Sequence, residues 1–255
     1  MGTDDLGFTA NELMVCEAAR RLRDGEVVFV GIGLPNLACN LARRLYAPKL
    51  VLIYESGAIG AEPERLPISI GDPALVTNSL SVCSMFDVFT FYLQRGLIDV
   101  GFLQGAQIDR FGNLNTTVIG NYQRPKVRLP GSGGACEIAI HAKRVVVIAP
   151  QSKRSFPERV DFVTSPGFVA SGQTRKGLGM PGGGPAAVIT NLGAYEFADG
   201  EMILKSLHPG CTIEQVRENI GWEVKISSNI RTTSIPTPEE LRVLREELDP
   251  THLFI

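Results

Sequence analysis

The chain has 255 residues, of which 44% are hydrophobic and 20% are charged, and its formal net charge is −2 with a pI near 6.0. This composition predicts a soluble globular protein, long enough for one large domain or two small ones. It gives no reason to expect nucleic acid or an anionic membrane as a partner. No apolar run approaches the roughly 20 residues that a membrane-spanning helix needs.

Cysteine and histidine usage favours a reducing compartment without a metal site. The five cysteines are Cys16, Cys39, Cys83, Cys136 and Cys211. They are scattered and form no CxxC pair, and the three histidines have no metal-binding spacing. The N-terminus is acidic and lacks the apolar stretch of a signal peptide. These features predict free thiols, no bound metal and a cytoplasmic protein.

The first sixty residues alternate between helical and strand patterns. Residues 11–24 predict an amphipathic helix, and the apolar run 27–30 predicts a buried parallel strand. A second helix is expected from about residue 36 to 45, followed by a second buried strand over residues 50–54. This second strand leads directly into Glu55.

The same alternation continues along the chain. We expect a helix over residues 86–95, then strands over 100–103, 144–149 and 186–190. The glycine-dense residues 167–185 predict a long surface loop, and Thr237 with Pro238 predicts the start of a C-terminal helix. Helices alternating with apolar strands predict an α/β fold with an open, mainly parallel sheet covered by helices. No linker forces a division, so residues 1–255 are predicted to form a single domain.

Glu55 is the first candidate catalytic residue. It follows an apolar strand and begins the pattern Glu-x-Gly-x-x-Gly with Gly57 and Gly60. Ligands of open α/β sheets gather at the carboxyl ends of strands, and glycines let a ligand come close to the backbone. The alternative is that Glu55 starts a helix or forms a salt bridge, while the glycines only make a turn. Position alone does not separate the two readings.

A second glycine-rich element precedes a predicted helix. Gly131, Gly133 and Gly134 lead into Ala135 and the helical pattern that follows. Unpaired backbone N–H groups at such a turn can bind a phosphate or stabilise a developing oxyanion. Glycine-rich turns before helices are also common for purely structural reasons. The run is neither a Walker A loop nor the Gly-x-Ser-x-Gly turn of a serine hydrolase.

Two further segments favour structural roles. Residues 31–35, Gly-Ile-Gly-Leu-Pro, lack the third glycine of a dinucleotide-binding fingerprint, which argues against NAD binding. Asp109 to Gly112 predicts a turn between strands. Asn113 and Asn115 follow that turn, where they can hold backbone or ligand carbonyl groups, and a structural role is the favoured interpretation.

Together these segments resemble the family I CoA-transferases, and most of all the B subunit of glutaconate CoA-transferases. Glu55, Gly57 and Gly60 match the family's Glu-x-Gly-x-x-Gly motif, and residues 131–135 match its Gly-x-Gly-Gly-Ala loop. The segments 31–35, 105–109, 112–115, 163–167 and 244–250 also resemble the same subunit. The similarity runs from about residue 11 to the end, and the order of the motifs makes it specific. It implies the NagB/RpiA/CoA-transferase-like fold.

The resemblance also implies a mechanism and a partner. Glu55 would attack an acyl-CoA thioester in a ping-pong reaction that passes through an anhydride and a glutamyl-CoA thioester, with the N–H groups of Gly133 and Gly134 as oxyanion donors. Coenzyme A is then a substrate, and no permanently bound cofactor is implied. The family's B subunit works beside an A subunit of related fold, which implies an α2β2 or larger assembly. Single-chain members are about twice as long as this chain.

Two competing functions accompany this interpretation, and two sequence features bear on the choice among them. The succinyl-CoA:3-oxoacid branch has Asn where this chain has Ser56, which favours a glutaconate-type acceptor without identifying it. Some relatives that have lost the glutamate perform decarboxylation or ring-cleaving hydrolysis, whereas Glu55 is present here. A hydrolase with Glu55 as general base, and a non-catalytic assembly subunit, are the competing functions.

Overall fold

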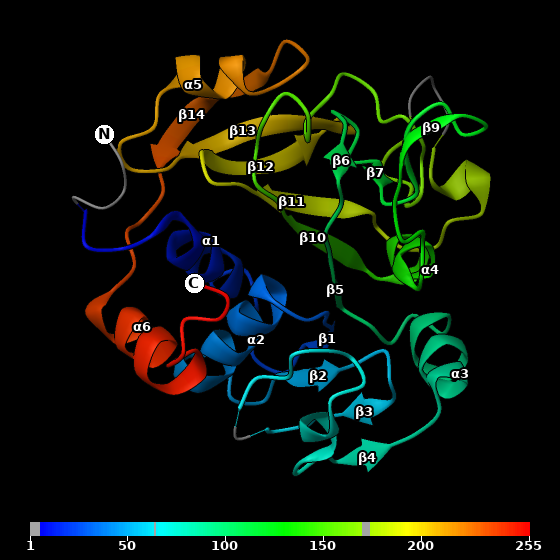
Figure 1. Ribbon diagram of the computed structural model, residues 1–255, viewed down its shortest axis with the longest axis vertical. Coiled ribbons are helices and arrows are strands. Elements are labelled where there is room, and N and C mark those ends of the chain that lie inside the picture. Colours follow the sequence, from blue (N-terminus) through cyan, green and yellow to red (C-terminus); the bar gives the residue numbers. More distant parts are fainter. Residues whose placement is uncertain (1–5, 64, 170–173) are drawn as a thin grey trace. The chain divides into compact units, whose positions relative to one another are not determined.

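The computed structural model describes residues 6–63, 65–169 and 174–255. The chain divides into two compact units (Figure 1). The first extends up to Phe102 and includes Ser234–Ile255 from the C-terminus, and the second is Leu103–Thr233. The arrangement of the whole of residues 1–255 as a single domain stays a prediction, and each unit is described by itself below.

The first unit is built on parallel strands with an antiparallel edge. Its strands are β1 (Val27–Phe29), β2 (Val51–Ile53), β3 (Ala58–Ile59), β4 (Ser81–Val82) and β5 (Val100–Leu103, all but its last residue). They lie in the order β5-β1-β2-β3-β4. β1 pairs in parallel with β2 and β5, and its Phe29 is aligned with Ile53 and Gly101. The carboxyl ends of these three strands therefore lie at one edge of the sheet. β3 is antiparallel to β2, and β4 is antiparallel to β3.

The longer helices of the first unit begin within two residues of their predicted starts, and the short 3-10 turn η2 (Pro73–Val76) was not predicted. The longer helices are α1 (Ala10–Ala19), α2 (Leu34–Leu45), α3 (Met85–Asp87) with its π-helical continuation η3 (Val88–Leu93), and α6 (Pro238–Arg242) with its continuation η5 (Val243–Leu248). Thr9 and Thr237 cap α1 and α6 through capping boxes. α1 packs on α2, and α2 packs on η5.

Two ion pairs join the ends of the chain within the first unit. The Arg20 Nη2 atom lies 2.6 Å from the Glu240 carboxylate, and the Arg245 guanidinium pairs with Glu12. Both glutamates are nearly inaccessible to solvent. Because a buried carboxylate is costly without its cation, these pairs fix the C-terminal helix against α1. The guanidinium of Arg245 and the capping bonds lower the pKa of Glu12 against the opposing effect of burial.

The second unit has a sheet of mixed direction. Its strands are β10 (Arg144–Ile148), β11 (Pro185–Ile189), β12 (Gly193–Ala198), β13 (Glu201–Leu207) and β14 (Lys225–Thr232). They lie in the order β14-β13-β12-β11-β10. The pairs β10–β11 and β13–β14 are parallel, and β12 is antiparallel to both neighbours. Val147, Val188 and Leu204 are fully buried in this sheet.

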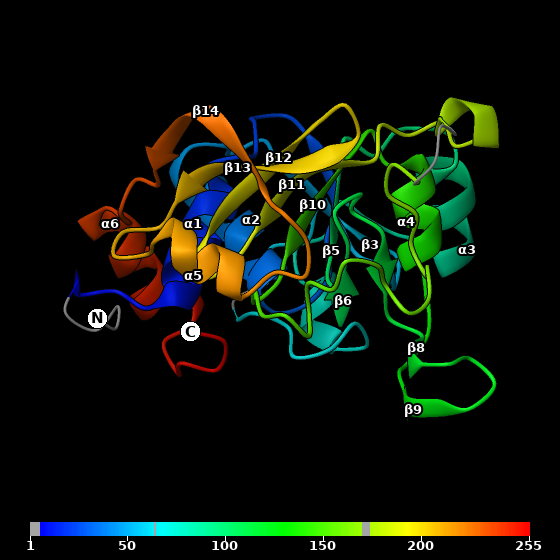
Figure 2. The same ribbon diagram turned by 90° about the horizontal axis from the view of Figure 1, so that it is seen from above.

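Short elements complete the second unit. They are the hairpin strands β6 (Gln107–Ile108) and β7 (Leu114–Asn115), the hairpin strands β8 (Val118–Gly120) and β9 (Pro125–Arg128), the helices α4 (Ala135–His141) and α5 (Ile213–Glu218), and the 3-10 turn η4 (Lys176–Leu178). Figure 2 shows the β8–β9 hairpin extending away from the body of this unit. Every residue of β9 is exposed.

The predicted α/β fold is confirmed. The predicted helices and buried strands are present, each within a few residues of its expected bounds. The turn of the β6–β7 hairpin over residues 109–112 was predicted, whereas β3, β4, the β8–β9 hairpin, β12, β13, β14 and α5 were not. Of the predicted loop over residues 167–185, residues 170–173 lie outside the described residues, and the remainder contains only η4 before β11. No helix in the described part of the chain combines the length and apolar composition of a membrane span.

Candidate active site

Glu55 lies in a tight turn at the carboxyl end of β2. The backbone N–H of Tyr54 donates to Ala58 O at 2.9 Å, and that of Gly57 donates to Tyr54 O at 2.9 Å. These bonds reverse the chain from β2 into β3. Glu55 is half-buried and Ser56 is exposed. Within the described residues, no group hydrogen-bonds or ion-pairs with the Glu55 carboxylate, so both of its oxygens are free to react.

Gly57 and Gly60 are required by the close approach of the chain itself. Gly57 has φ +110°, and a Cβ there would lie 1.9 Å from the carbonyl oxygen of Cys83. Gly60 has φ +65°, and its Cβ would lie 2.6 Å from Leu80 Cδ1. Both conformations strain any L-residue. The packing of the segment around β4 against this turn thus accounts for the glycine spacing, and the approach of a ligand to these glycines stays a prediction.

A buried hydrogen-bond network between Tyr54 and α2 supports the Glu55 turn. The Tyr54 hydroxyl donates to Asn36 Oδ1 at 2.8 Å, and Asn40 Nδ2 donates to the same oxygen at 2.8 Å. Asn36 and Asn40 are on α2, one turn apart, and both are buried. Burial raises the pKa of Tyr54 well above its usual range, so its hydroxyl remains a donor. Asn36 Nδ2 has no partner within the described residues.

The amino end of α2 lies beside the Glu55 turn. Val30 N–H donates to Ile53 O at 3.0 Å, so the residues after β1 leave the sheet next to the end of β2. Gly33, with φ +85°, is the N-cap of α2 and provides no side-chain cap. The unpaired N–H groups and the dipole at this helix end favour negative charge nearby. Residues 31–35 therefore contain the start of α2, which begins at Leu34, two residues before its predicted start.

The glycine loop over residues 131–135 belongs to the second unit. Gly131 N–H donates to Thr116 O at 2.8 Å, and the Thr116 hydroxyl donates to Gly131 O at 2.7 Å. Gly131 and Gly133 have φ +98° and +48°, yet a Cβ at either position would meet no atom of the described residues within 4 Å. The N–H groups of Gly133 and Gly134 have no acceptor among these residues. This loop leads into α4 at Ala135 and leaves two backbone donors unused.

The predicted site residues thus fall into two groups. Glu55, Gly57 and Gly60 come together in the first unit, and Gly131, Gly133, Gly134 and Ala135 come together in the second. Sequence reasoning missed the support provided by Tyr54, Asn36 and Asn40. The i, i+4 spacing of the two asparagines was a visible signal that they share a helix face. Their contact with Tyr54 depends on tertiary packing and carries no local signal.

Residues 109–115 have the structural role that was favoured for them. The buried Asp109 carboxylate accepts hydrogen bonds from Phe111 N–H and Asn113 N–H, which closes the β6–β7 turn. Asn113 Oδ1 accepts from Gly167 N–H at 2.8 Å, and Asn115 donates to Gln107 and to Val118 O. Burial raises the pKa of Asp109. These side chains hold the backbone of the second unit.

Histidine and cysteine residues form no reactive cluster in the described part of the chain. His208 is buried between Thr233 Oγ1 at 2.9 Å and Thr190 O at 2.7 Å. Burial lowers its pKa to about 4, so it is neutral near pH 7. All five cysteines are free thiols, and burial raises the pKa of each. The described residues contain no group of three or more His, Cys, Asp or Glu that could hold a metal ion.

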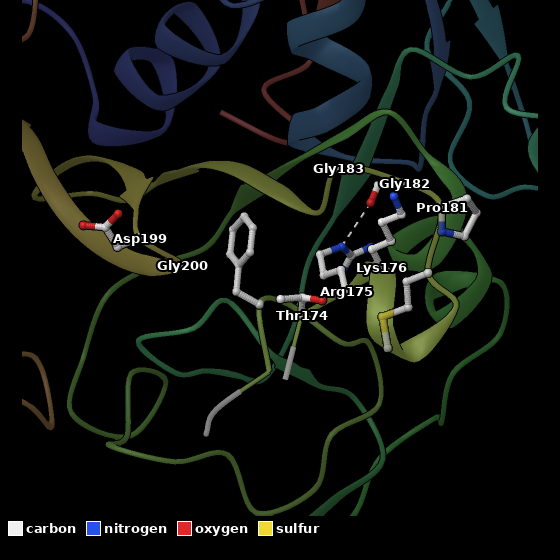
Figure 3. Close-up of a pocket in the computed structure, with 10 residues that line it drawn as sticks. Thr174, Arg175, Lys176, Pro181, Gly182, Gly183, Asp199 and Gly200 are labelled. Carbon is white, nitrogen blue, oxygen red and sulfur yellow. Dashed lines mark hydrogen bonds between the residues drawn. The ribbon is translucent and has the colours of Figure 1, made fainter. Parts of the chain in front are cut away.

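A cavity of about 650 Å³ lies elsewhere in the second unit (Figure 3). Thr174, Lys176 and Pro181 contribute to its lining, together with Arg175, whose Nε donates to Gly182 O. The buried Arg175 guanidinium also donates to Ala139 O at 2.6 Å, near the carboxyl end of α4. The glycine loop is at the opposite end of that helix. Carbonyl oxygens take up all three guanidinium nitrogens, so Arg175 has a structural role.

The sequence of this chain matches a known protein family. The family model described as coenzyme A transferase matches residues 12–219, which contain both the Glu55 turn and the glycine loop. The chain belongs to the coenzyme A transferase family. The family predicted from the motifs is therefore confirmed, and so is its enzymatic class.

Individual CoA-transferases match over nearly the whole chain. The B subunit of 3-oxoadipate CoA-transferase from Pseudomonas knackmussii is 53% identical over 240 residues, which are 93% of this chain and 92% of that protein. The B subunit of glutaconate CoA-transferase from Acidaminococcus fermentans is 35% identical over 99% of this chain and 97% of its own length. The crystal structure of the latter enzyme superposes with a TM-score of 0.91 and covers 97% of each chain.

A relative with different chemistry is more distant. The IpdB subunit of a cholesterol ring-cleaving hydrolase from Rhodococcus jostii is 28% identical, over 86% of this chain and 83% of its own length. The fold thus carries more than one reaction, and the function has to be argued from the site. These relatives are all named as subunits, as the resemblance implied.

Proposed function

We propose that this chain is the B subunit of a two-chain CoA-transferase and that Glu55 is its covalent nucleophile. The observation that carries the proposal is the free carboxylate of Glu55, held in a fixed turn at the carboxyl end of a parallel strand, in a chain of the CoA-transferase family. A carboxylate that no protein group neutralises keeps its lone pairs available for attack. Support by Tyr54 and by the packing around Gly57 fixes the backbone of the turn that carries Glu55 before reaction.

The proposed reaction proceeds in four substitutions at carbonyl carbon. A Glu55 oxygen attacks the thioester carbon of acyl-CoA, the C–S bond breaks, and CoA leaves as a thiolate. The thiolate then attacks the glutamyl carbon of the resulting anhydride, which releases the acid as a carboxylate and leaves a glutamyl-CoA thioester. An incoming carboxylate and the thiolate repeat these steps in reverse, which regenerates Glu55 and forms the new acyl-CoA. Only carboxylate and thioester chemistry is used, so the mechanism requires no resident cofactor.

We assign the oxyanion donors to the glycine loop. The N–H groups of Gly133 and Gly134 have no acceptor in the described chain, and Gly133 is exposed. Donors of this kind stabilise the negative oxygen that develops when a carbonyl is attacked. The preceding Gly131 is fixed by two hydrogen bonds with Thr116, which limits movement of the loop during the reaction.

The proposed acceptor is a short dicarboxylic acid, and the proposed partner is an A subunit. The two CoA-transferase relatives above are named for 3-oxoadipate and glutaconate, which are both dicarboxylic acids. We propose 3-oxoadipate as the first acceptor to test, because its enzyme is 53% identical to this chain. Both relatives are B subunits, which supports an A subunit here in an α2β2 or larger assembly. The proposed compartment is the cytoplasm, since free thiols are typical of a reducing environment.

The covalent step can be trapped. The assembled enzyme is incubated with a dicarboxylyl-CoA and then with borohydride, which reduces a glutamyl thioester to an alcohol. We expect peptide mass spectrometry to find the reduced side chain at Glu55, and we expect activity to be lost. Glu55→Gln should lower kcat/KM on the order of 10⁴-fold or more. Glu62→Gln is the matched control, because Glu62 is an exposed carboxylate in the same unit and should change activity little.

The competing functions predict different results. A hydrolase would consume acyl-CoA without any carboxylate acceptor, and an unmodified Glu55 in a fully inactivated enzyme would exclude the covalent mechanism. A non-catalytic assembly subunit would tolerate Glu55→Ala with little loss of turnover. Strict dependence on a carboxylate acceptor, together with labelling at Glu55, would support CoA transfer and neither of the competing functions.

A further inference from the structure

A stretch of the first unit exposes large apolar side chains on and around β4. The exposed fractions are 76% for Leu80, 59% for Val82, 69% for Phe86 and 59% for Phe91. The rings of Phe86 and Phe91 contact each other edge to face, with centroids 6.5 Å apart. We call Leu80, Val82, Met85, Phe86 and Phe91 the β4–α3 face. Single exposed apolar residues are normal, but a run of them that includes two aromatic rings marks a binding surface.

Charge is almost absent from the chain that forms this surface. From residue 66 to residue 91 the sequence contains two charged residues, Asp72 and Asp87. The Asp72 side chain is buried and pairs with Arg65 at 2.7 Å, and the Asp87 carboxylate accepts hydrogen bonds from Ser84 at the start of α3. The core of a protein–protein interface is depleted of charge and enriched in aromatic residues and methionine, which this face also has. The composition of this face is therefore typical of a surface that is buried against another protein, rather than of one that faces water or binds a charged small molecule.

β4 also leaves one edge open. It is the last strand in the order of the first unit (Figure 1). Both of its residues are exposed. Within the described residues of this unit, only β3 pairs with it. Natural proteins usually protect such an edge with charged side chains or proline. The residues beside it here are apolar, which is expected of an edge that a partner covers.

The face is continuous with the Glu55 turn. Cys83, directly after β4, donates its N–H to Gly57 O at 3.0 Å, and Leu80 donates its N–H to Ile59 O at 2.9 Å. The Leu80 side chain lies against Gly60, in the space a Cβ would need. Whatever covers the β4–α3 face therefore also borders the turn that carries Glu55.

We propose that the β4–α3 face is the docking surface for the A subunit. This inference rests on the proposed two-chain function. The anhydride proposed at Glu55 must be kept from water, and in this chain Glu55 is only half-buried beside the exposed Ser56. A second copy of this chain is a less suitable partner for this face. A two-fold symmetric contact through the face would bring the Glu55 turns of both copies together at one junction. The A subunit should present an apolar, charge-poor surface to this face.

The test replaces apolar side chains of the face by a charge and measures assembly rather than activity. Val82→Glu and Phe86→Glu are each co-expressed with a tagged A subunit, and the complex is quantified by co-purification and sedimentation velocity. We expect each variant to weaken the association of the two chains at least about tenfold, since each buries a charge at the interface. Ile235→Glu is the matched control, because Ile235 is 58% exposed in the same unit and lies outside the face. Far-UV circular dichroism and thermal melting of each free chain test whether it is folded.

The outcomes separate this inference from the proposed function. Folded Val82→Glu and Phe86→Glu chains that bind the A subunit as tightly as the control would overturn the docking surface. Loss of self-association of this chain, with binding to the A subunit intact, would assign the face to a second copy and would also overturn it. Glu55→Ala should assemble normally, because Glu55 borders the face without belonging to it. Failure to label Glu55 in an intact two-chain complex would refute the nucleophile and leave the docking surface standing.

Discussion

Two glycine-containing turns, residues 55–60 and 131–135, look similar in sequence but use their glycines for different reasons. In the first turn, a side chain at Gly57 would collide with the carbonyl oxygen of Cys83 at 1.9 Å. In the second, a Cβ at Gly131 or Gly133 would meet no atom of the described chain within 4 Å, although both residues have positive φ. The first turn needs glycine to make room for its own chain. The second needs it for backbone conformation and leaves the adjacent space open.

The backbone donors differ in the same way. Gly57 and Gly60 in the first turn donate to Tyr54 O and Leu52 O, so these N–H groups are used by the fold. Gly133 and Gly134 in the second have no acceptor within the described chain. The first turn therefore offers a side chain, the Glu55 carboxylate, on a packed support. The second offers backbone hydrogen-bond donors, which fits the division into nucleophile and oxyanion site that we propose.

The largest stability effect should come from Gly57→Ala. The new Cβ would overlap Cys83 O, and φ +110° is strained for alanine, so the turn or β4 must move. We expect the free energy of unfolding to fall by about 3 kcal/mol or more, measured by urea denaturation. A loss below about 1 kcal/mol would mean that the segment around β4 yields easily and that the first turn is less rigid than its packing indicates.

Gly133→Ala should affect activity more than stability. Alanine at φ +48° costs about 1–2 kcal/mol, and within the described residues no atom would contact its methyl group. That methyl group would occupy the open space beside the proposed donors, so we expect kcat/KM to fall about 10²-fold in steady-state assays. Gly25→Ala is the matched control, since Gly25 also has positive φ and open surroundings. A similar loss of activity in both variants would indicate a general effect of strain and would contradict the role of the loop.

The sequence predicts the parallel strands well because their signal is continuous and local. The apolar runs that become β1, β2, β5, β10 and β11 are each flanked by turn residues, which is typical of buried strands. β3 and β4 have two residues each, too few for a periodic pattern. The hairpin between β12 and β13 had a readable signal, because Asp199 and Gly200 form its turn with φ +53° and +78°.

The candidate site likewise combines features that have a local sequence signal with features that depend on long-range packing. Glu55 could be selected because a carboxylate at a strand end, followed by two glycines, is a local pattern. The reason for those glycines could not be predicted, since Cys83 and Leu80 approach them from about twenty residues or more away along the chain. The same holds for Tyr54 and Asn36, whose hydrogen bond joins β2 to α2. Local sequence thus identifies the reactive group, and long-range packing determines what holds it.

The smallest expected effect tests that support directly. Tyr54→Phe removes the hydroxyl that donates to Asn36 Oδ1, while Asn40 still donates to the same oxygen at 2.8 Å. We expect a loss of about 1 kcal/mol in the free energy of unfolding, the usual contribution of one hydrogen bond. Burial raises the pKa of Tyr54, so the hydroxyl is un-ionised at neutral pH and the loss should not change across that range.

The matched control for Tyr54→Phe is Tyr46→Phe in the same unit. Within the described residues the Tyr46 hydroxyl has no hydrogen-bond partner, so its removal should change stability by less than about 0.5 kcal/mol. If Tyr54→Phe instead leaves stability unchanged and lowers kcat, the network beneath Glu55 sets the position of the carboxylate rather than the strength of the fold. In that case both turns would depend on hydrogen bonds, the first through Tyr54 and the second through Thr116. The two turns would then differ only in the reason why each needs glycine.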